Sequence, residues 1–179
     1  MLIVGLLNES VGYLMIRIYR NNLLNSNIYT LVEFVLFLWF FYRIKQQKFI
    51  WLLVAGSLGL AAWMLDNLWL HSIMESNSIF RIFSSLIIVW LSIDKITQLI
   101  LNGIMDPFKK SDLLFCFGFF AYFTYRSFIH IFKLFTLSHP PSFYADFWLI
   151  LAILNILINI TYTIGILWIP KQQEPMAHS

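Results

Sequence analysis

The sequence predicts an all-α protein, a polytopic transmembrane helical bundle of about six membrane-spanning helices joined by short loops. Sixty per cent of the 179 residues are hydrophobic, only 12% are charged, and the mean hydropathy is +0.76. An α-helix crosses a hydrocarbon core of about 30 Å with roughly 20 apolar residues. Stretches such as 28–41 and 149–158 are largely apolar. Helices satisfy their own backbone hydrogen bonds in lipid, which makes them the expected form of these stretches.

The expected elements follow one another with little sequence between them. The spans are 1–19, 28–44, 49–71, 80–102, 113–135 and 144–169, and together they form a single transmembrane domain over 1–169. Turns are expected at Asn21–Asn27 and Glu75–Ser78, and helix breakers at Asp106-Pro107 and His139-Pro140-Pro141. Proline cannot continue a helix, and it restricts the residue before it. The polar tail 170–179 is expected to be a disordered C-terminal segment.

The first span is predicted to be a retained helix, because Met1–Leu7 is apolar at once without a basic leader, and Glu9 interrupts it. In the third span, Ala55-x-x-x-Gly59 and Ser57-x-x-x-Ala61 provide small residues on one face. Small residues let the backbones of neighbouring membrane helices approach closely.

Charge placement gives an expected orientation and argues against nucleic acid as a partner. The formal charge is +3, but the bases lie mainly in short loops and form no basic stripe of the kind that phosphate binding needs. Six spans put both termini on one side, with six bases at Arg43, Lys45, Lys48, Lys109, Lys110 and Lys171. The opposite side has four, at Arg17, Arg20, Arg81 and Lys133. The positive-inside rule therefore predicts cytoplasmic termini in a cell membrane.

Several ionisable residues fall inside the spans, where a charge is costly unless it is paired or hydrated. Helical spacing places Tyr122, Arg126, His130 and Lys133 on one face of the fifth span. It also aligns Asp94 with Gln98 and Asn102, and Asn155 with Asn159 and Tyr162. Glu33, Asp66 and Arg126 should share one half of the membrane, where Arg81 begins the fourth span. Opposite charges from at least four helices are therefore expected to converge there.

This cluster has two interpretations. Glu33, Asp66 and Arg126, together with Asn155, could form a structural polar lock. Alternatively, Glu33, Asp66, Arg126, His130 and Asn155 could bind a ligand or ion, since intramembrane charges often mark functional sites. A structural role is the simpler explanation for four further polar residues, Tyr29, Arg81, Asp94 and Asn159. Asp94-Lys95 could be partly self-neutralising, or Lys95 could reach the membrane surface.

Catalytic and metal-binding signatures do not accompany these residues. The sequence has no H-E-x-x-H, no G-x-S-x-G and no P-loop, so no enzymatic activity, cofactor or metal is predicted. His71, His130 and His139 gather toward one side of the membrane but follow no metal-ligand spacing, which favours interfacial histidines. The single cysteine, Cys116, cannot form an intrachain disulfide and is expected to be a small buried hydrophobe.

Short motifs resemble those of uncharacterised small multi-pass membrane proteins of Bacteroidota. They are Asn21-Asn22 followed by Ile28-Tyr29 and Glu33-Phe34, Ser78-Ile79-Phe80-Arg81, the stretch Phe117–Phe123, and Leu154–Ile160. The resemblance covers most of the chain and implies a bacterial inner-membrane helical bundle. It supplies no catalytic residues, and it directs attention to Tyr29, Glu33, Arg81, Asn155 and Asn159. Members often begin with more apolar sequence, so the first helix here is expected to be shortened.

Two functions are favoured by these features, and a third, an intramembrane enzyme, would need a water-filled cavity that joins a nucleophile or metal to an acid–base group. The first is a non-enzymatic sensory or partner-binding module in the lipid bilayer, working with a membrane signalling protein or as a homo-oligomer. The second is a small ion- or proton-coupled transporter that uses Glu33 and Asp66 as intramembrane carboxylates. The absence of a clear inverted repeat and the bias of the charges toward one side favour the first.

Overall fold

The part of the chain that the structure describes folds into a bundle of six α-helices. The computed structural model describes residues 2–44, 49–70, 72–101, 107–135 and 141–167, and in these residues it contains helices and no strands. The helices are α1 (Leu2–Tyr19), α2 (Leu23–Arg43), α3 (Phe49–Met64), α4 (Ser78–Leu101), α5 (Pro107–Phe135) and α6 (Pro141–Leu167). A π-helix, η1 (Leu65–Leu70), continues directly from α3. The expected tail at 170–179 lies outside the described residues.

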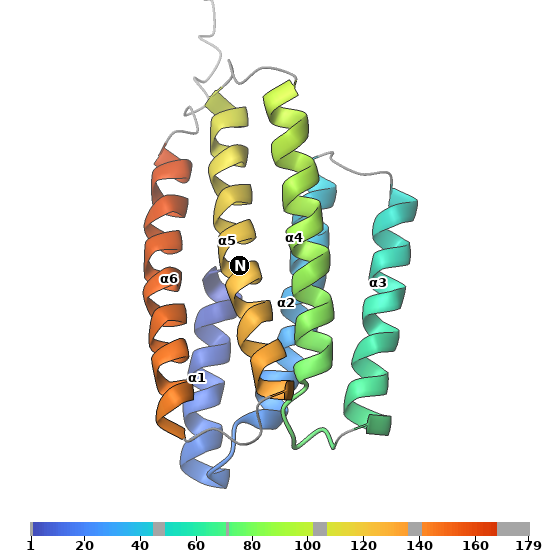
Figure 1. Cartoon of the computed structure of the whole chain (residues 1–179), viewed down its shortest axis with the longest axis vertical. Coiled ribbons are helices and arrows are strands. Elements are labelled where there is room, and N and C mark those ends of the chain that lie inside the picture. Colours follow the sequence, from blue (N-terminus) through green and yellow to red (C-terminus); the bar gives the residue numbers. More distant parts are fainter. Residues whose placement is uncertain (1, 45–48, 71, 102–106, 136–140, 168–179) are drawn as a thin grey trace, which may run out of the picture.

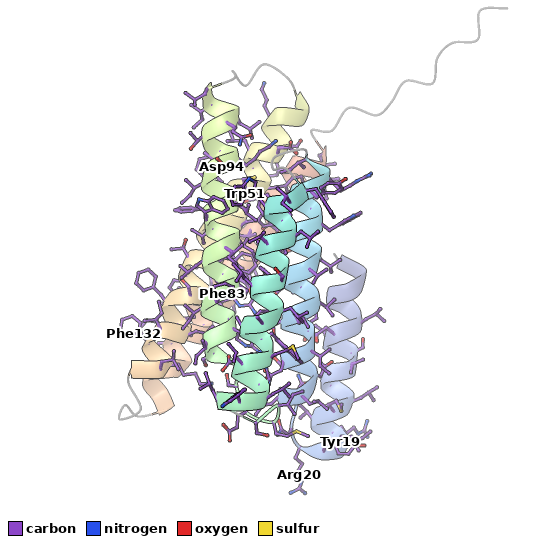
Figure 2. The ribbon with its side chains drawn as sticks, turned by 90° about the vertical axis from the view of Figure 1, so that its right-hand side faces the viewer. Tyr19, Arg20, Trp51, Phe83, Asp94 and Phe132 are labelled. Carbon is purple, nitrogen blue, oxygen red and sulfur yellow. The ribbon has the colours of Figure 1, made fainter. Side chains whose placement is uncertain are left out.

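Within the described ranges, four helical stretches are long and apolar enough to cross a membrane, namely Leu23–Arg43, Phe49–Leu70, Lys110–Leu134 and Leu149–Leu167. The helices lie side by side, with α4, α5 and α6 in one layer and α1, α2 and α3 in the other (Figures 1 and 2). The labelled Tyr19 and Arg20 lie at one end of the bundle, whereas Trp51 and Asp94 lie toward the other (Figure 2). The all-helical class is confirmed, and the four apolar helices support a membrane location.

Four helices, α2, α4, α5 and α6, begin earlier than the sequence pattern indicated, with α4 beginning at Ser78 rather than at 80. α2 begins at Leu23 rather than at 28, so the prediction of a turn through Asn21–Asn27 is wrong for most of that segment. Its asparagines take part in contacts instead: the Asn21 side chain accepts a hydrogen bond from the Leu23 N–H, and Asn25 donates to Asn8 of α1. α5 and α6 begin at Pro107 and Pro141, because proline fits the first position of a helix, where its missing N–H costs nothing.

Phenylalanine fills the space between the two layers. Phe37 of α2 meets Phe119 and Phe123 of α5 edge-to-face, with ring centroids 4.8 Å apart in both pairs. Among the described residues, no Cα atom of α2 comes within 8 Å of one in α5. Large side chains therefore bridge these two helices. Cys116 is also fully buried in this core, as expected.

Small residues allow closer packing elsewhere. Gly59 of α3 is buried directly against the ring of Phe34 in α2, which a methyl group on Gly59 would overlap. The prediction of a close-packing face is thus confirmed at Gly59, whereas Ser57 and Ala61 are exposed. α4 presents Ser84, Ser85 and Ser92 as buried small residues and packs against α2, α3 and α5.

Candidate functional site

An ion pair between Glu33 and Arg126 joins the two layers of the bundle. Glu33 lies on α2 and Arg126 on α5, and the Arg126 Nη1 donates to Glu33 Oε2 over 2.6 Å. The side chains are 18% and 8% exposed, so both charges are largely removed from solvent. A buried charge is tolerated when it is paired and hydrogen-bonded. The structure therefore brings together two of the three residues expected at the centre of the cluster.

Aromatic rings surround the guanidinium of Arg126. Its Cζ lies 6.0 Å from the ring centroid of Tyr122 and 5.6 Å from that of Phe123. Both distances are in the range of cation–π attraction. Tyr29, one turn before Glu33 on α2, lies within electrostatic range of Glu33, Tyr122 and Arg126. The pair thus sits in an aromatic enclosure formed by α2 and α5.

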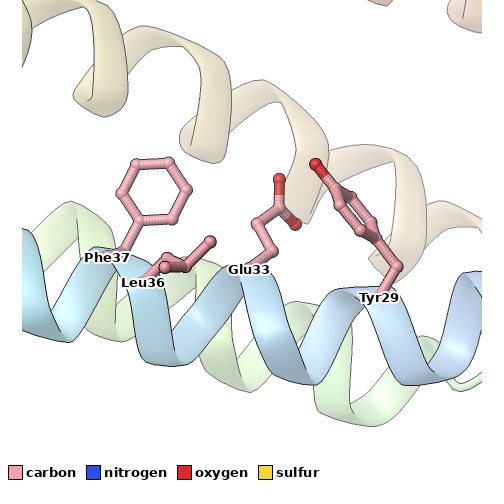
Figure 3. A pocket seen from close by; sticks show the side chains of 4 residues that line it. All are labelled: Tyr29, Glu33, Leu36 and Phe37. Atoms are coloured by element: carbon pink, nitrogen blue, oxygen red, sulfur yellow. The ribbon is translucent and has the colours of Figure 1, made fainter. Parts of the chain in front are cut away.

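A small pocket opens beside Glu33 on α2. Tyr29, Glu33, Leu36 and Phe37 line it, and its volume is about 80 Å³. Figure 3 shows Glu33 and Tyr29 projecting from α2 on the same side as Phe37. Drug-sized ligands occupy sites of roughly 300–1,000 Å³, so this pocket has room for a few waters or one small ion.

Asp66 has a different role from Glu33. It is fully buried in η1, and its Oδ2 accepts the backbone N–H of Phe80 over 2.7 Å. Phe80 is in the first turn of α4, where N–H groups have no partner within the helix and the helix dipole favours a negative charge. Asp66 therefore caps α4 from a neighbouring helix.

Replacing Asp66 by alanine is expected to lower the free energy of unfolding by about 1–2 kcal/mol, the cost of losing a helix cap. Unfolding with SDS in mixed micelles, followed by circular dichroism, measures this change. The control is Asp94→Ala, because Asp94 accepts from Gln98 within the same helix, and such a pair contributes about 0.2–0.5 kcal/mol. Equal losses in the two variants would contradict the capping role.

Arg81 is held by the start of α2. Its Nε donates to Asn77 Oδ1 over 2.6 Å, and its Nη2 donates to Ser26 Oγ over 2.7 Å. The Asn77 amide in turn donates to Thr30 Oγ1. Arg81 is also within electrostatic range of Arg126, Glu33 and Asp66. Of the four charged residues expected to converge, Glu33 and Arg126 form a direct ion pair in the described residues, whereas Asp66 and Arg81 are hydrogen-bonded to other groups.

Sequence reasoning missed Asn27 and Asn77, which organise this end of the bundle. Asn27 is fully buried, and its amide donates to the carbonyls of Ile73 and Glu75 in the connection between η1 and α4. The Trp63 indole donates to the Asn27 carbonyl. The position of Asn27 directly before the apolar run could have indicated a buried asparagine, but the residue was predicted to be part of a turn.

The remaining predicted residues lie away from direct contact with the pair. His130 is 2% exposed with Arg81, Arg126 and Lys133 around it. Three cationic neighbours make a poor environment for a metal ion, and the described residues contain no group of three metal-ligating side chains that could hold one. His71 and His139 lie outside the described residues.

Asp94 belongs to the opposite end of the bundle, as Figure 2 shows. Lys95 there donates to the Ile44 carbonyl at the end of α2 and lies 4.0 Å from Asp112. Lys95 thus pairs with another helix rather than with the adjacent aspartate. Asn155 and Asn159 are exposed on α6 and are hydrogen-bonded to each other.

The comparisons with known proteins add no family to this description. No protein-family model, curated protein or solved structure matches the chain.

Proposed function

We propose that this chain is a multi-pass protein of a bacterial inner membrane, with six spans and cytoplasmic termini, acting as a non-enzymatic sensory or partner-binding module. Its partner would be a membrane signalling protein. The proposal includes α1 and α4 as spans in addition to the four helices that meet the length and hydropathy criteria. The sensory or partner-binding role is supported by the buried ion pair between Glu33 and Arg126.

The packing of α4 supports the larger number of spans. α4 has 24 residues, about 36 Å at 1.5 Å per residue, and it packs against α2, α3 and α5. A helix surrounded by spanning helices shares their depth. α1 contributes an uncovered apolar face, with Leu7, Val11, Leu14 and Ile18 all exposed, which suits contact with lipid chains.

The Glu33–Arg126 pair supports a sensory role because it lies in an interface of α2 and α5 that is formed by side chains. α2 and α5 meet through side chains, with the ion pair at one level and phenylalanine rings beside it. Rearranging side chains can alter such an interface without breaking a helix. A partner or bilayer state that favours one arrangement shifts the population toward it by its difference in affinity.

Affinity purification from chemically cross-linked membranes tests this function. We expect one membrane protein to co-purify in near-stoichiometric amount with the native chain and much less with a Glu33→Gln/Arg126→Gln variant. Asp112→Asn, which alters the ion pair at the other end, is the matched control and should retain the partner. Absence of any specific partner, combined with unchanged signalling in a deletion strain, would overturn the proposal.

The pocket beside Glu33 favours a second candidate function, a small ion- or proton-coupled transporter. The Glu33 side chain lines that pocket and is more exposed than Arg126. Proteoliposomes containing the chain would then show ion flux that Glu33→Gln abolishes. Lack of flux for protons, sodium and potassium would exclude this candidate for those ions.

A further inference from the structure

The outer surface of α6 carries an amide pair, Asn155 and Asn159, that is exposed and hydrogen-bonded within its own helix. α6 lies at the edge of the bundle and packs only against α5 among the described helices (Figure 1). Leu151, Ile158 and Gly165 form its buried side. Asn155 and Asn159 are both exposed and lie four residues apart, so they follow one another along the surface of the helix.

These amides lie at the depth where water is scarcest. The apolar stretch Leu149–Leu167 is the most apolar of the four membrane-capable stretches. Asn155 is six residues from its beginning and Asn159 is eight residues from its end, or roughly 9 and 12 Å along the helix. Polar groups that face lipid chains at this depth carry a free-energy cost unless they find hydrogen-bond partners.

The hydrogen bonds within α6 leave some donors and acceptors of the two side-chain amides without a partner. The Asn159 amide donates to Asn155 Oδ1 over 3.3 Å, which uses one donor and one acceptor. A side-chain amide has two N–H donors and a carbonyl oxygen, so the Asn155 amide group and the Asn159 oxygen remain for an external partner. The nearby threonines are already engaged, because Thr161 and Thr163 donate to carbonyls of their own helix.

A second copy of the chain is the occupant that matches this surface. Two copies in one membrane have the same orientation, so a two-fold axis along the membrane normal runs their α6 helices parallel at equal depth. Asn155 then faces Asn155, and Asn159 faces Asn159. The partial charges are complementary in such a pair, because each amide offers a positive N–H group and a negative oxygen. A buried asparagine pairs with its own copy in this way in parallel coiled coils.

The neighbouring residue supports close approach. Ala152, three residues before Asn155, is exposed on the same side of α6, and small residues let membrane helices pack tightly enough for side-chain hydrogen bonds. We propose that α6 forms the contact between two copies of this chain, with Asn155 and Asn159 hydrogen-bonded across a two-fold axis. This contact is independent of the Glu33–Arg126 pair and of any other partner protein.

Cysteine cross-linking in membranes tests the proposed face. Cys116 is the chain's single cysteine, so Cys116→Ala provides a cysteine-free background in the full-length chain. Oxidation should produce a disulfide-linked dimer with Ala152→Cys and none with Leu157→Cys, whose position is exposed on the far side of α6. Equal cross-linking at both positions, no dimer at Ala152, or a cross-link to a different protein would overturn the proposal.

The role of the amides is tested by the dimer dissociation constant, measured by energy transfer between labelled copies in micelles. Asn155→Leu/Asn159→Leu should weaken association by at least about tenfold, whereas Asn155→Gln/Asn159→Gln should retain part of it. Circular dichroism should show an unchanged helical fold in all variants. A leucine variant that dimerises as tightly as the native chain would contradict the inference, as would a native chain that is monomeric throughout.

Discussion

Replacement of Arg126 by leucine is expected to lower the free energy of unfolding by about 3–5 kcal/mol, because it leaves the carboxylate of Glu33 buried without its partner. Glu33→Leu should cost a similar amount, since the guanidinium would remain 8% exposed beside apolar rings. The double variant Glu33→Leu/Arg126→Leu should lose less than either single variant, because a well-packed apolar pair requires no desolvation of charge. SDS-induced unfolding of all three variants supplies the double-mutant cycle.

The ion pair at the other end of the bundle provides the control. Lys95 and Asp112 are 4.0 Å apart, with side chains 11% and 28% exposed, and Lys95 also donates to the Ile44 carbonyl. Because this hydrogen bond remains in Asp112→Leu and the ion pair is long, the variant should cost only about 1 kcal/mol. The structural importance assigned to Glu33–Arg126 is wrong if Asp112→Leu lowers the free energy of unfolding as much as Arg126→Leu does. It is also wrong if the double variant is less stable than both single variants.

The second large effect is expected at Gly59. A methyl group there overlaps the ring of Phe34, which is 1% exposed and packed edge-to-face against Phe80. Gly59→Ala should therefore cost about 1–3 kcal/mol through overpacking, and Gly59→Val should cost more.

Gly56 is the matched control, one turn earlier on α3. A methyl group at Gly56 meets only Leu38 Cδ1, at an ordinary contact distance of 3.5 Å. Gly56→Ala should leave stability unchanged or raise it by up to about 1 kcal/mol, because alanine favours helix more than glycine does. Thermal and SDS unfolding of the two alanine variants make the comparison, and a larger loss at Gly56 would contradict the assigned packing.

Hydrophobicity was sufficient to predict the helices, and depth along them was sufficient to predict that Glu33 and Arg126 lie in the same half of the bundle. Both inferences depend on local properties, namely the length of apolar runs and the rise of a helix. The small-residue pattern likewise identified Gly59. The helix starts at Pro107 and Pro141 could also have been predicted from the sequence, because proline is common at the first position of a helix.

The hydrogen-bond partners of Asp66, Asn27 and Lys95 could not be predicted from such local properties of the sequence. Each bonds to backbone atoms of another element: Asp66 to Phe80, Asn27 to Ile73 and Glu75, and Lys95 to Ile44. Backbone donors and acceptors are the same in every residue, so the sequence carries no sign of which one a side chain will reach. Only the packing of the helices decides it.

The π-helix η1 has a consequence for the length of the chain. A π-turn contains more residues than an α-turn over a similar rise. The segment 65–70 therefore includes more residues than an α-helix would need to span the same length. A single deletion within this segment can be absorbed by rewinding to α-geometry, with the backbone on either side left in place. What such a deletion would remove is the burial of Asp66 and Asn67 together, and with it the cap on α4. A chain shortened there would keep its helices and lose the contact that fixes where one of them starts.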